Sequence, residues 1–233
     1  MTDESHCRER VSERDHDRYL ATLYAPADKR PALFALHALD LELAEVVRTT
    51  SEPMLGQIRL AWWRERLQGL DRGERPGQPV LDALAEHLLP HGVSGSSLEP
   101  LEDANLALLE GGSLEAHASA RGRLFGAAAR LLAPALDAEA IATAERLGAG
   151  WAAVEAFRMG HFAPDEAGVA MAERWLALVG LPSAIRPITA LAALARRDLA
   201  ALRRAGLDPA KVDWRRGTPG RQARLLWSIV TGR

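Results

Sequence analysis

The chain of 233 residues has one cysteine, Cys7, only two lysines, and no excess of either charge, with 29 Lys+Arg against 31 Asp+Glu. A single cysteine can form neither an internal disulfide nor a thiolate zinc site, so we expect a reducing, cytoplasmic environment. The net charge of −2 argues against a nucleic-acid partner, which attracts proteins with an excess of cations.

Long apolar runs are also missing, because Arg, Glu, Asp or Pro interrupts each Ala/Leu stretch before the roughly 18 residues that a membrane-spanning helix needs. We therefore expect at most a peripheral membrane contact. The first 18 residues are rich in acids and arginines and lack the apolar centre of a signal peptide. We predict a flexible polar leader over 1–18 and a single domain over 19–233.

Strand-forming residues are scarce, since Val and Ile together number only 15, while Ala, Leu, Glu and Arg fill nearly every segment between Gly and Pro. The fold class is therefore predicted to be all-α. Apolar residues at helical spacing predict helices over 28–49, 53–71, 79–89, 98–110, 114–133, 138–159, 165–179, 183–205 and 219–230. No linker or repeat interrupts the pattern, which favours one helical bundle.

Motifs of common enzyme classes are absent from the sequence: it has no phosphate-binding P-loop, no nucleophile elbow and no dinucleotide-binding turn. His87 and His91 have the spacing of two zinc ligands, but Pro90 ends the helix between them and no third ligand is evident. Glu99, Glu102 and Asp103 are typical of an acidic first helical turn, which we favour over a cation site.

The C-terminal segment 196–233 holds ten Arg or Lys and three Asp or Glu, and it ends in an apolar run. Two interpretations stay open. A basic amphipathic helix could rest on an anionic membrane surface. We favour the alternative, in which the last helix packs its apolar face on the bundle and its arginines face water.

Two helices near the N-terminus carry candidate binding residues. Glu42, Glu45 and Arg48 share one helical surface, where they could form an ordinary ion-pair patch. The next helix adds two indoles flanked by guanidinium groups: Arg59, Trp62, Trp63 and Arg66. These groups could receive a diphosphate and a hydrocarbon chain, or they could be a core tryptophan with a partly exposed neighbour.

The segment from Asp17 to Leu67 resembles the opening of the squalene/phytoene synthase family. The resemblance is carried by Asp17-Arg18-Tyr19, by Leu23-Tyr24-Ala25-Pro26, by the run Arg30 to Ala38 and by the run Glu52 to Arg64. It continues more loosely in Ala144 to Gly148 with Trp151, in Arg158 before Gly160, and in Arg197-Asp198-Leu199. It implies an isoprenoid-synthase fold, a helical bundle around a deep apolar cavity.

Active members of that family join two prenyl diphosphates head to head, with two aspartate-rich motifs that hold Mg²⁺ ions on the departing diphosphate. In place of the first motif this chain has Ala44-Glu45-Val46-Val47-Arg48, in which an arginine competes with the metal for Glu45. In place of the second it has Arg158-Met159-Gly160-His161-Phe162-Ala163-Pro164, without the acids. The resemblance therefore implies that both metal sites are lost.

This loss resembles a divergent branch of the family that includes an assembly factor of mitochondrial respiratory complex I. We expect a catalytically inactive or altered protein that binds an isoprenoid diphosphate or another lipid and acts in assembly of a membrane complex. Its candidate cavity and diphosphate-binding residues are Glu45, Arg59, Trp62 and Arg158. No metal or other cofactor is expected, and the sequence names no protein partner.

The alternative is a Mg²⁺-dependent head-to-head prenyltransferase of isoprenoid biosynthesis. It would use Asp40, Glu42 and Glu45 as metal ligands, with Arg59 and Arg158 as diphosphate clamps. We rank it lower because Asp40 and Glu45 lie about 140° apart around a helix. A third hypothesis is a helical scaffold that contacts only proteins and fills its cavity with its own side chains.

Overall fold

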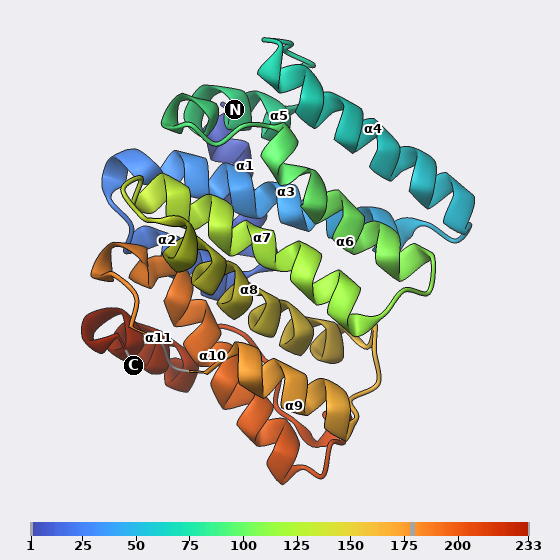
Figure 1. The fold of residues 1–233 in the computed structure, drawn as a ribbon, viewed down its shortest axis with the longest axis vertical. Helices are drawn as coiled ribbons and strands as arrows, with labels where there is room; N and C mark the ends of the chain where they lie inside the picture. The colour runs from blue at the N-terminus through green and yellow to red at the C-terminus, as the bar shows by residue number, and fades with distance from the viewer. Residues whose placement is uncertain (1, 178–179, 233) are drawn as a thin grey trace.

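The computed structural model describes residues 2–177 and 180–232, and every regular element within these ranges is helical (Figure 1). The all-α prediction is thus confirmed. The helices are α1 (Asp3–Arg14), α2 (His16–Leu23), α3 (Arg30–Thr49), α4 (Pro53–Asp71), α5 (Pro79–His87), α6 (Glu99–Leu109), α7 (Leu114–Leu132), α8 (Ala138–Met159), α9 (Glu166–Trp175), α10 (Arg186–Arg204) and α11 (Pro219–Thr231).

Nine of the predicted helices appear within a few residues of their expected bounds. Proline in the first turn begins α3, α4, α5, α6, α10 and α11, and side-chain caps from Ser113 and Asp137 begin α7 and α8. These are local signals, which explains why the sequence reports them well. The end of the helix predicted over 165–179 includes two residues that lie outside the described ranges.

The middle of the bundle is the antiparallel pair α7 and α8, with α3, α5 and α6 on one side and α9, α10 and α11 on the other (Figure 1). Glycines let the two central helices approach closely. A Cβ atom on Gly122 would stand 2.5 Å from the Glu145 carbonyl oxygen, and one on Gly148 would stand 2.6 Å from the Gly122 carbonyl oxygen. The two backbones are therefore in contact where side chains would normally separate them.

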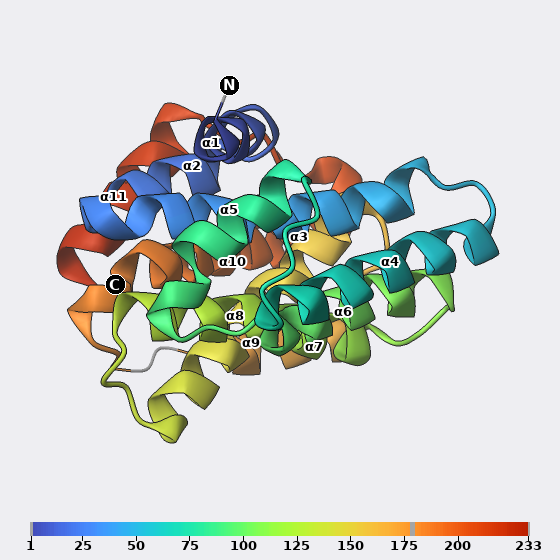
Figure 2. The same ribbon diagram turned by 90° about the horizontal axis from the view of Figure 1, so that it is seen from above.

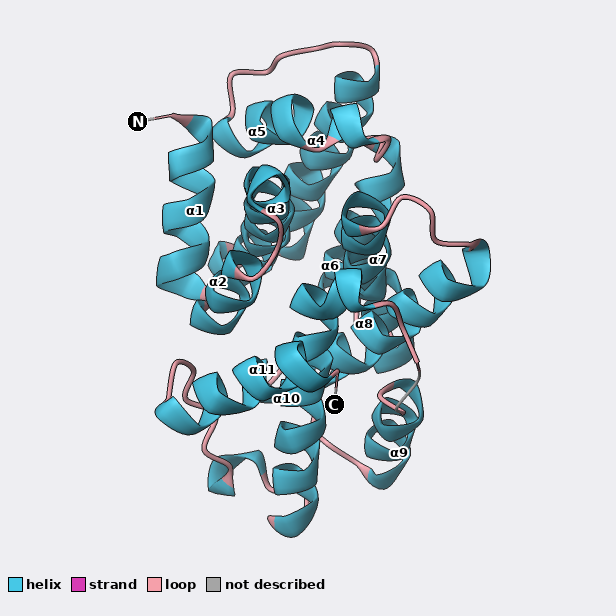
Figure 3. Ribbon diagram, turned by 90° about the vertical axis from the view of Figure 1, so that its left-hand side faces the viewer, coloured by secondary structure: helices cyan, strands magenta, loops and turns pink. Residues whose placement is uncertain are grey.

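Residues 2–18 differ from the flexible leader predicted over 1–18. Residues 3–14 form α1, which packs against α3 and α5, and α2 begins at His16 (Figure 3). Cys7 and Val11, one helical turn apart, have no exposed surface. Two apolar residues at i and i+4 anchor a helix whose remaining faces are charged, and so short a stripe is easily missed in a polar sequence.

No described helix combines the length and the hydropathy that crossing a membrane requires. Seen from above, α1 and α2 lie along one edge of the molecule, while α4 projects at the far right and α11 lies at the left (Figure 2). The segments that converge between these ends are the junction of α1 and α2, the middle of α3, and the facing parts of α7 and α8.

Candidate functional site

A pocket of about 280 Å³ opens where α1, α2, α3, α7 and α8 converge. Nine of its thirteen lining residues are charged. The six cations are Arg14, Arg18, Arg48, Arg121, Arg158 and Arg216, and the three anions are Asp15, Glu45 and Glu155. We call this site the arginine pocket. Most of its lining is therefore charged, whereas the resemblance implies an apolar cavity.

The floor of the arginine pocket is built on Asp40, which α3 places in the interior with no exposed surface. Arg121 donates from Nε and Nη2 to the two carboxylate oxygens at 2.8 and 2.7 Å, and Arg18 Nη1 donates to Oδ2 at 2.7 Å. Burial alone would raise the pKa of Asp40, but the two guanidinium groups outweigh it and hold the pKa well below its ordinary value. Asp40 is therefore a fixed anion whose acceptor sites are committed to arginine.

Trp151 of α8 lies behind this ion cluster. The guanidinium carbons of Arg121 and Arg18 stand 4.7 and 5.4 Å from its ring centroid, and the ring of Phe125 stacks on it at 5.5 Å. Cation–π contacts of this kind stabilise cations that have lost much of their water. The interior behind the ion cluster is thus occupied by an indole and by the arginines packed on it.

One wall of the pocket is a chain of ion pairs centred on Arg216, which precedes α11. Its guanidinium contacts Asp15 and Glu155, and Glu155 also accepts from Arg158 Nη2 at 2.7 Å. Burial, followed by the charge of Arg221, lowers the pKa of Arg216 to about 9. Its Nε has no hydrogen-bond partner among the described residues. The wall therefore holds a buried cation with one unused donor.

The rim is formed by Glu45, which is held between Arg14 of α1 and Arg48 of its own helix. The hydrogen bond from Arg48 is the main reason that the pKa of Glu45 lies below its ordinary value. Both partners are partly exposed, so this pair is more adaptable than the buried floor. The apolar contribution at the mouth comes from Leu41, Ala44 and Met159.

The family described as squalene/phytoene synthase matches residues 11–158, which is well over half of the chain. The chain belongs to the squalene/phytoene synthase family. Its fold is similar to the crystal structure of a dehydrosqualene synthase in complex with ligand, at a TM-score of 0.75 and 14% identity, over 99% of this chain and 96% of that one. The helical fold implied by the resemblance is thus confirmed.

Curated relatives of this family member carry the name of a respiratory-complex assembly factor. The chain is 32% identical over 98 residues to human "NADH dehydrogenase (ubiquinone) complex I, assembly factor 6", and 35% identical over 94 residues to its homolog in Drosophila melanogaster. The matched segments cover 42% and 40% of this chain but only 29% and 28% of those relatives. The homology is therefore distant and partial.

The residues expected at the family's binding site divide into two groups. Glu45 and Arg158 line the arginine pocket, as do Ala44 and Arg48 of the altered first motif. Arg59 instead donates to the hydroxyl groups of Thr49 and Thr50 outside it.

Trp62 also lies outside the arginine pocket. It is 41% exposed and stands edge-on to Trp63, with 5.2 Å between the ring centroids. Helical spacing places a residue on a helix, but the direction in which that helix faces depends on its partners. The packing of α4 on α6 turns this part of the helix away from the pocket.

Several pocket residues escaped the sequence analysis, most clearly Arg18, Arg121 and Arg216. Their chemistry is ordinary, and only the fold brings them within reach of one carboxylate cluster. One usable signal existed: Asp40 interrupts an otherwise apolar stretch of the helix, and a buried acid requires a cationic partner.

The acids of the alternative metal site take different partners. Asp40 is held by arginines, Glu42 pairs with Arg10 at 2.8 Å, and Glu45 pairs with Arg14 and Arg48. In the described ranges, no group of three or more His, Cys, Asp or Glu side chains is placed to hold a metal ion. The chemistry of this donor set therefore does not fit Mg²⁺, which needs uncommitted carboxylate oxygens.

The other polar clusters noted in the sequence have structural partners. Glu99 and Glu102 lie in the first turn of α6, as predicted, and Arg64 of α4 bridges Glu102 and Asp103. His91 is 3.1 Å from the ammonium group of Lys29, while His87 lies at the end of α5.

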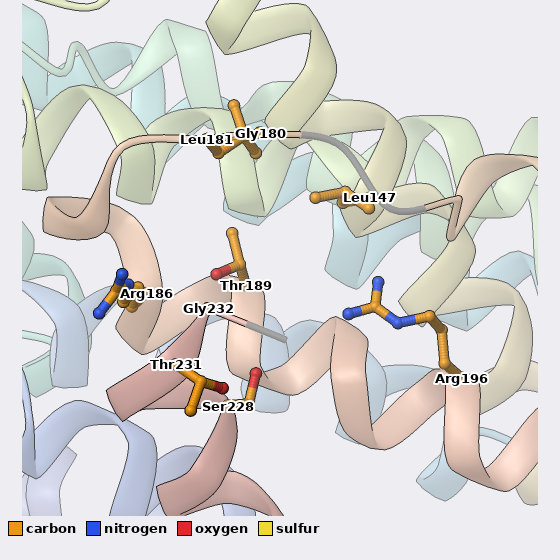
Figure 4. A pocket seen from close by; sticks show the side chains of 9 residues that line it. All are labelled: Leu147, Gly180, Leu181, Arg186, Thr189, Arg196, Ser228, Thr231 and Gly232. Atoms are coloured by element: carbon orange, nitrogen blue, oxygen red, sulfur yellow. The ribbon is translucent and has the colours of Figure 1, made fainter.

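A second pocket, of about 180 Å³, lies between α8, α10 and the end of α11 (Figure 4). Its two arginines already donate to backbone carbonyls: Arg186 to Ile229 and Val230, and Arg196 to Leu176. These contacts tie the end of α11 and the end of α9 to α10. We assign this pocket a structural role.

Proposed function

We propose that this family member is a non-catalytic binding protein that takes an anionic amphiphile, an isoprenoid diphosphate or another lipid, into the arginine pocket and acts in assembly of a membrane complex. The proposal rests mainly on one observation: the carboxylate of Asp40 accepts hydrogen bonds from both Arg18 and Arg121. A carboxylate bound in this way cannot coordinate the metal that activates a departing diphosphate.

The charge of the site supports an anionic ligand. The lining contains six arginines and three acids, and Asp40 lies directly behind it as a fourth acid. The site therefore has an excess of two positive charges. Such a site repels a divalent cation and attracts a phosphate or diphosphate group. Arg48 and Arg158, near the mouth, are placed to meet the headgroup, and the unused Nε of Arg216 adds a donor.

The size of the site supports one headgroup and not a pair of prenyl chains. Its volume of about 280 Å³ is just below the usual range of roughly 300–1,000 Å³ for ligand pockets. Trp151 and its arginine partners close the interior. A hydrocarbon tail would leave along Leu41 and Met159, and Met159 is 47% exposed.

The part in assembly rests on the names of the curated relatives. If this role is shared, deletion of the gene in its native organism will lower the amount of assembled NADH dehydrogenase complex on a native gel. An unchanged amount would remove the assembly role and leave the ligand proposal standing.

The ligand proposal is tested by thermal unfolding with farnesyl diphosphate or inorganic diphosphate, each with Mg²⁺ or with a chelator. A ligand at about 100 times its dissociation constant stabilises the folded state by about 2.7 kcal/mol. We expect a rise in Tm that does not depend on Mg²⁺, and no C30 hydrocarbon product. A Mg²⁺-dependent rise together with product would overturn the proposal in favour of the prenyltransferase.

Two variants sharpen the test. Arg48→Ala removes a rim cation while Glu45 keeps Arg14, so it should weaken ligand binding without unfolding the protein. Arg72→Ala is the matched control, because Arg72 also pairs locally with an acid, Glu74, but lies outside the pocket. Equal ligand responses from the two variants would locate the ligand elsewhere.

A further inference from the structure

α11 is apolar on both its inner and its outer face. Leu225 is buried against the bundle, together with the ion-paired Arg221. Leu226, Trp227 and Val230 are 44%, 57% and 65% exposed. At 100° per residue these three point away from the buried face of the helix. We call them the outer face of α11.

An exposed apolar cluster of this kind marks an interaction surface, because isolated hydrophobic residues are common on protein surfaces but clusters are not. The indole N–H of Trp227 has no hydrogen-bond partner among the described residues. An indole with an apolar ring and a free donor is suited to a boundary between water and an apolar phase.

Charge decides which partner fits this surface. The chain has no Asp or Glu from Trp214 to Gly232. Arg224 lies on α11 itself, and the guanidinium of Arg197 stands beside Gly220 at the start of the helix. Arg186 donates to carbonyls at its end. In the described structure none of these three arginines forms an ion pair; Arg197 interacts only at longer range with Asp198 and Asp213, which pair with Arg221 and Arg215.

α4 offers an instructive contrast. Its outer face is also apolar, with Met54, Ile58 and Trp62 exposed by 69%, 60% and 41%. An acid accompanies its cations, however, since Glu65 lies on the same helix surface. Figures 1 and 2 place α4 and α11 at opposite ends of the molecule, so one flat surface cannot cover both.

We propose that the outer face of α11 docks on the surface of an anionic lipid bilayer. Leu226, Trp227 and Val230 enter the boundary between headgroups and acyl chains, while Arg197 and Arg224 contact lipid phosphates. Apolar burial and electrostatic attraction act together in such a helix, and each is weak alone. The inference goes beyond the arginine pocket, which faces a different part of the bundle and is not needed for docking.

The test is flotation with vesicles of phosphatidylcholine alone and of phosphatidylcholine mixed with phosphatidylglycerol. We expect the protein to float with the mixed vesicles and not with the neutral ones. The variant Leu226→Ser/Trp227→Ser/Val230→Ser should lose flotation, and Arg224→Glu should lower partitioning about fivefold or more. All four substituted side chains are exposed, so far-UV circular dichroism and Tm should match the parent protein.

Met54→Ser/Ile58→Ser/Trp62→Ser is the matched control, because it also removes three exposed apolar side chains, in this case from α4. It should float like the parent. Equal flotation of the α11 variant, or equal binding of the parent to neutral vesicles, would overturn the proposal. So would light scattering that shows a dimer lost only in the α11 variant without vesicle binding, since a second copy of the chain would then cover this face.

Discussion

Arg121 and Asp40 are 81 residues apart in the chain, yet two parallel hydrogen bonds of 2.8 and 2.7 Å join the guanidinium to the carboxylate in the interior of the bundle. The pair links α7 to α3, and Arg18 extends the link to α2. A buried ion pair contributes little net stability, but its disruption is costly because the remaining charge is left without a partner.

Asp40→Asn should therefore destabilise the protein by about 3–5 kcal/mol, because Arg18 and Arg121 would remain buried without their counter-ion. Urea unfolding followed by circular dichroism measures this change. Glu45→Gln is the control. It should lower the free energy of unfolding by less than about 1 kcal/mol, because the ion pairs at the rim are partly exposed. Similar losses in both variants would show that the floor is not a dry ion cluster.

Cys7 should be unreactive toward thiol reagents in the folded protein. Burial is the main cause that raises the pKa of its thiol to about 12, and its side chain has no exposed surface. Reaction with a chromogenic disulfide at pH 8 should be slow in buffer and rapid in urea. Rapid reaction in buffer would mean that α1 is detached and that the segment is a flexible leader after all.

Stability should fall as the pH is lowered from 7 to 5, partly because of His117. Burial, with help from Arg121, lowers the pKa of His117 to about 4 in the folded state, against 6.5 when it is unfolded. The unfolded chain therefore binds the proton first, so the stabilisation is present above pH 6.5 and is lost as the pH falls toward 4. This residue alone should lower the free energy of unfolding by about 2 kcal/mol at pH 5.

His117→Gln tests this assignment, because glutamine keeps a donor for the Ala104 carbonyl that His117 contacts at 2.7 Å but does not titrate. Urea unfolding at pH 7 and pH 5 should show a smaller pH dependence in the variant. The dependence should not vanish, because burial also lowers the pKa of His37, to about 3. If the pH dependence of stability were unchanged in the variant, other groups would have to cause it.

Gly122→Ala should destabilise the bundle by about 1–3 kcal/mol, because the added Cβ would overlap the Glu145 carbonyl and force α7 away from α8. Gly220→Ala in α11 is the matched control. Its added Cβ would come no closer than 3.8 Å to Arg197, so this change should be neutral or slightly stabilising. If Gly122→Ala left the free energy of unfolding unchanged, the two helices would be able to separate at little energetic cost.

The sequence by itself determined nine helices and the family, because both depend on local patterns. Proline in the first turn and apolar residues at helical spacing act within a few residues of the positions that they affect. The same local reading named Glu45, Arg48 and Arg158, and all three line the arginine pocket.

The tertiary structure alone decided which charges meet and which faces are buried. The pairing of Arg121 with Asp40, and of Arg216 with Asp15 and Glu155, joins helices that are distant in sequence, and any of many arginines could have been the partner. The anchoring of α1 through Cys7 rests on equally remote contacts. Ion pairs and packing act through space over a few ångströms, so only the folded arrangement of the helices selects them.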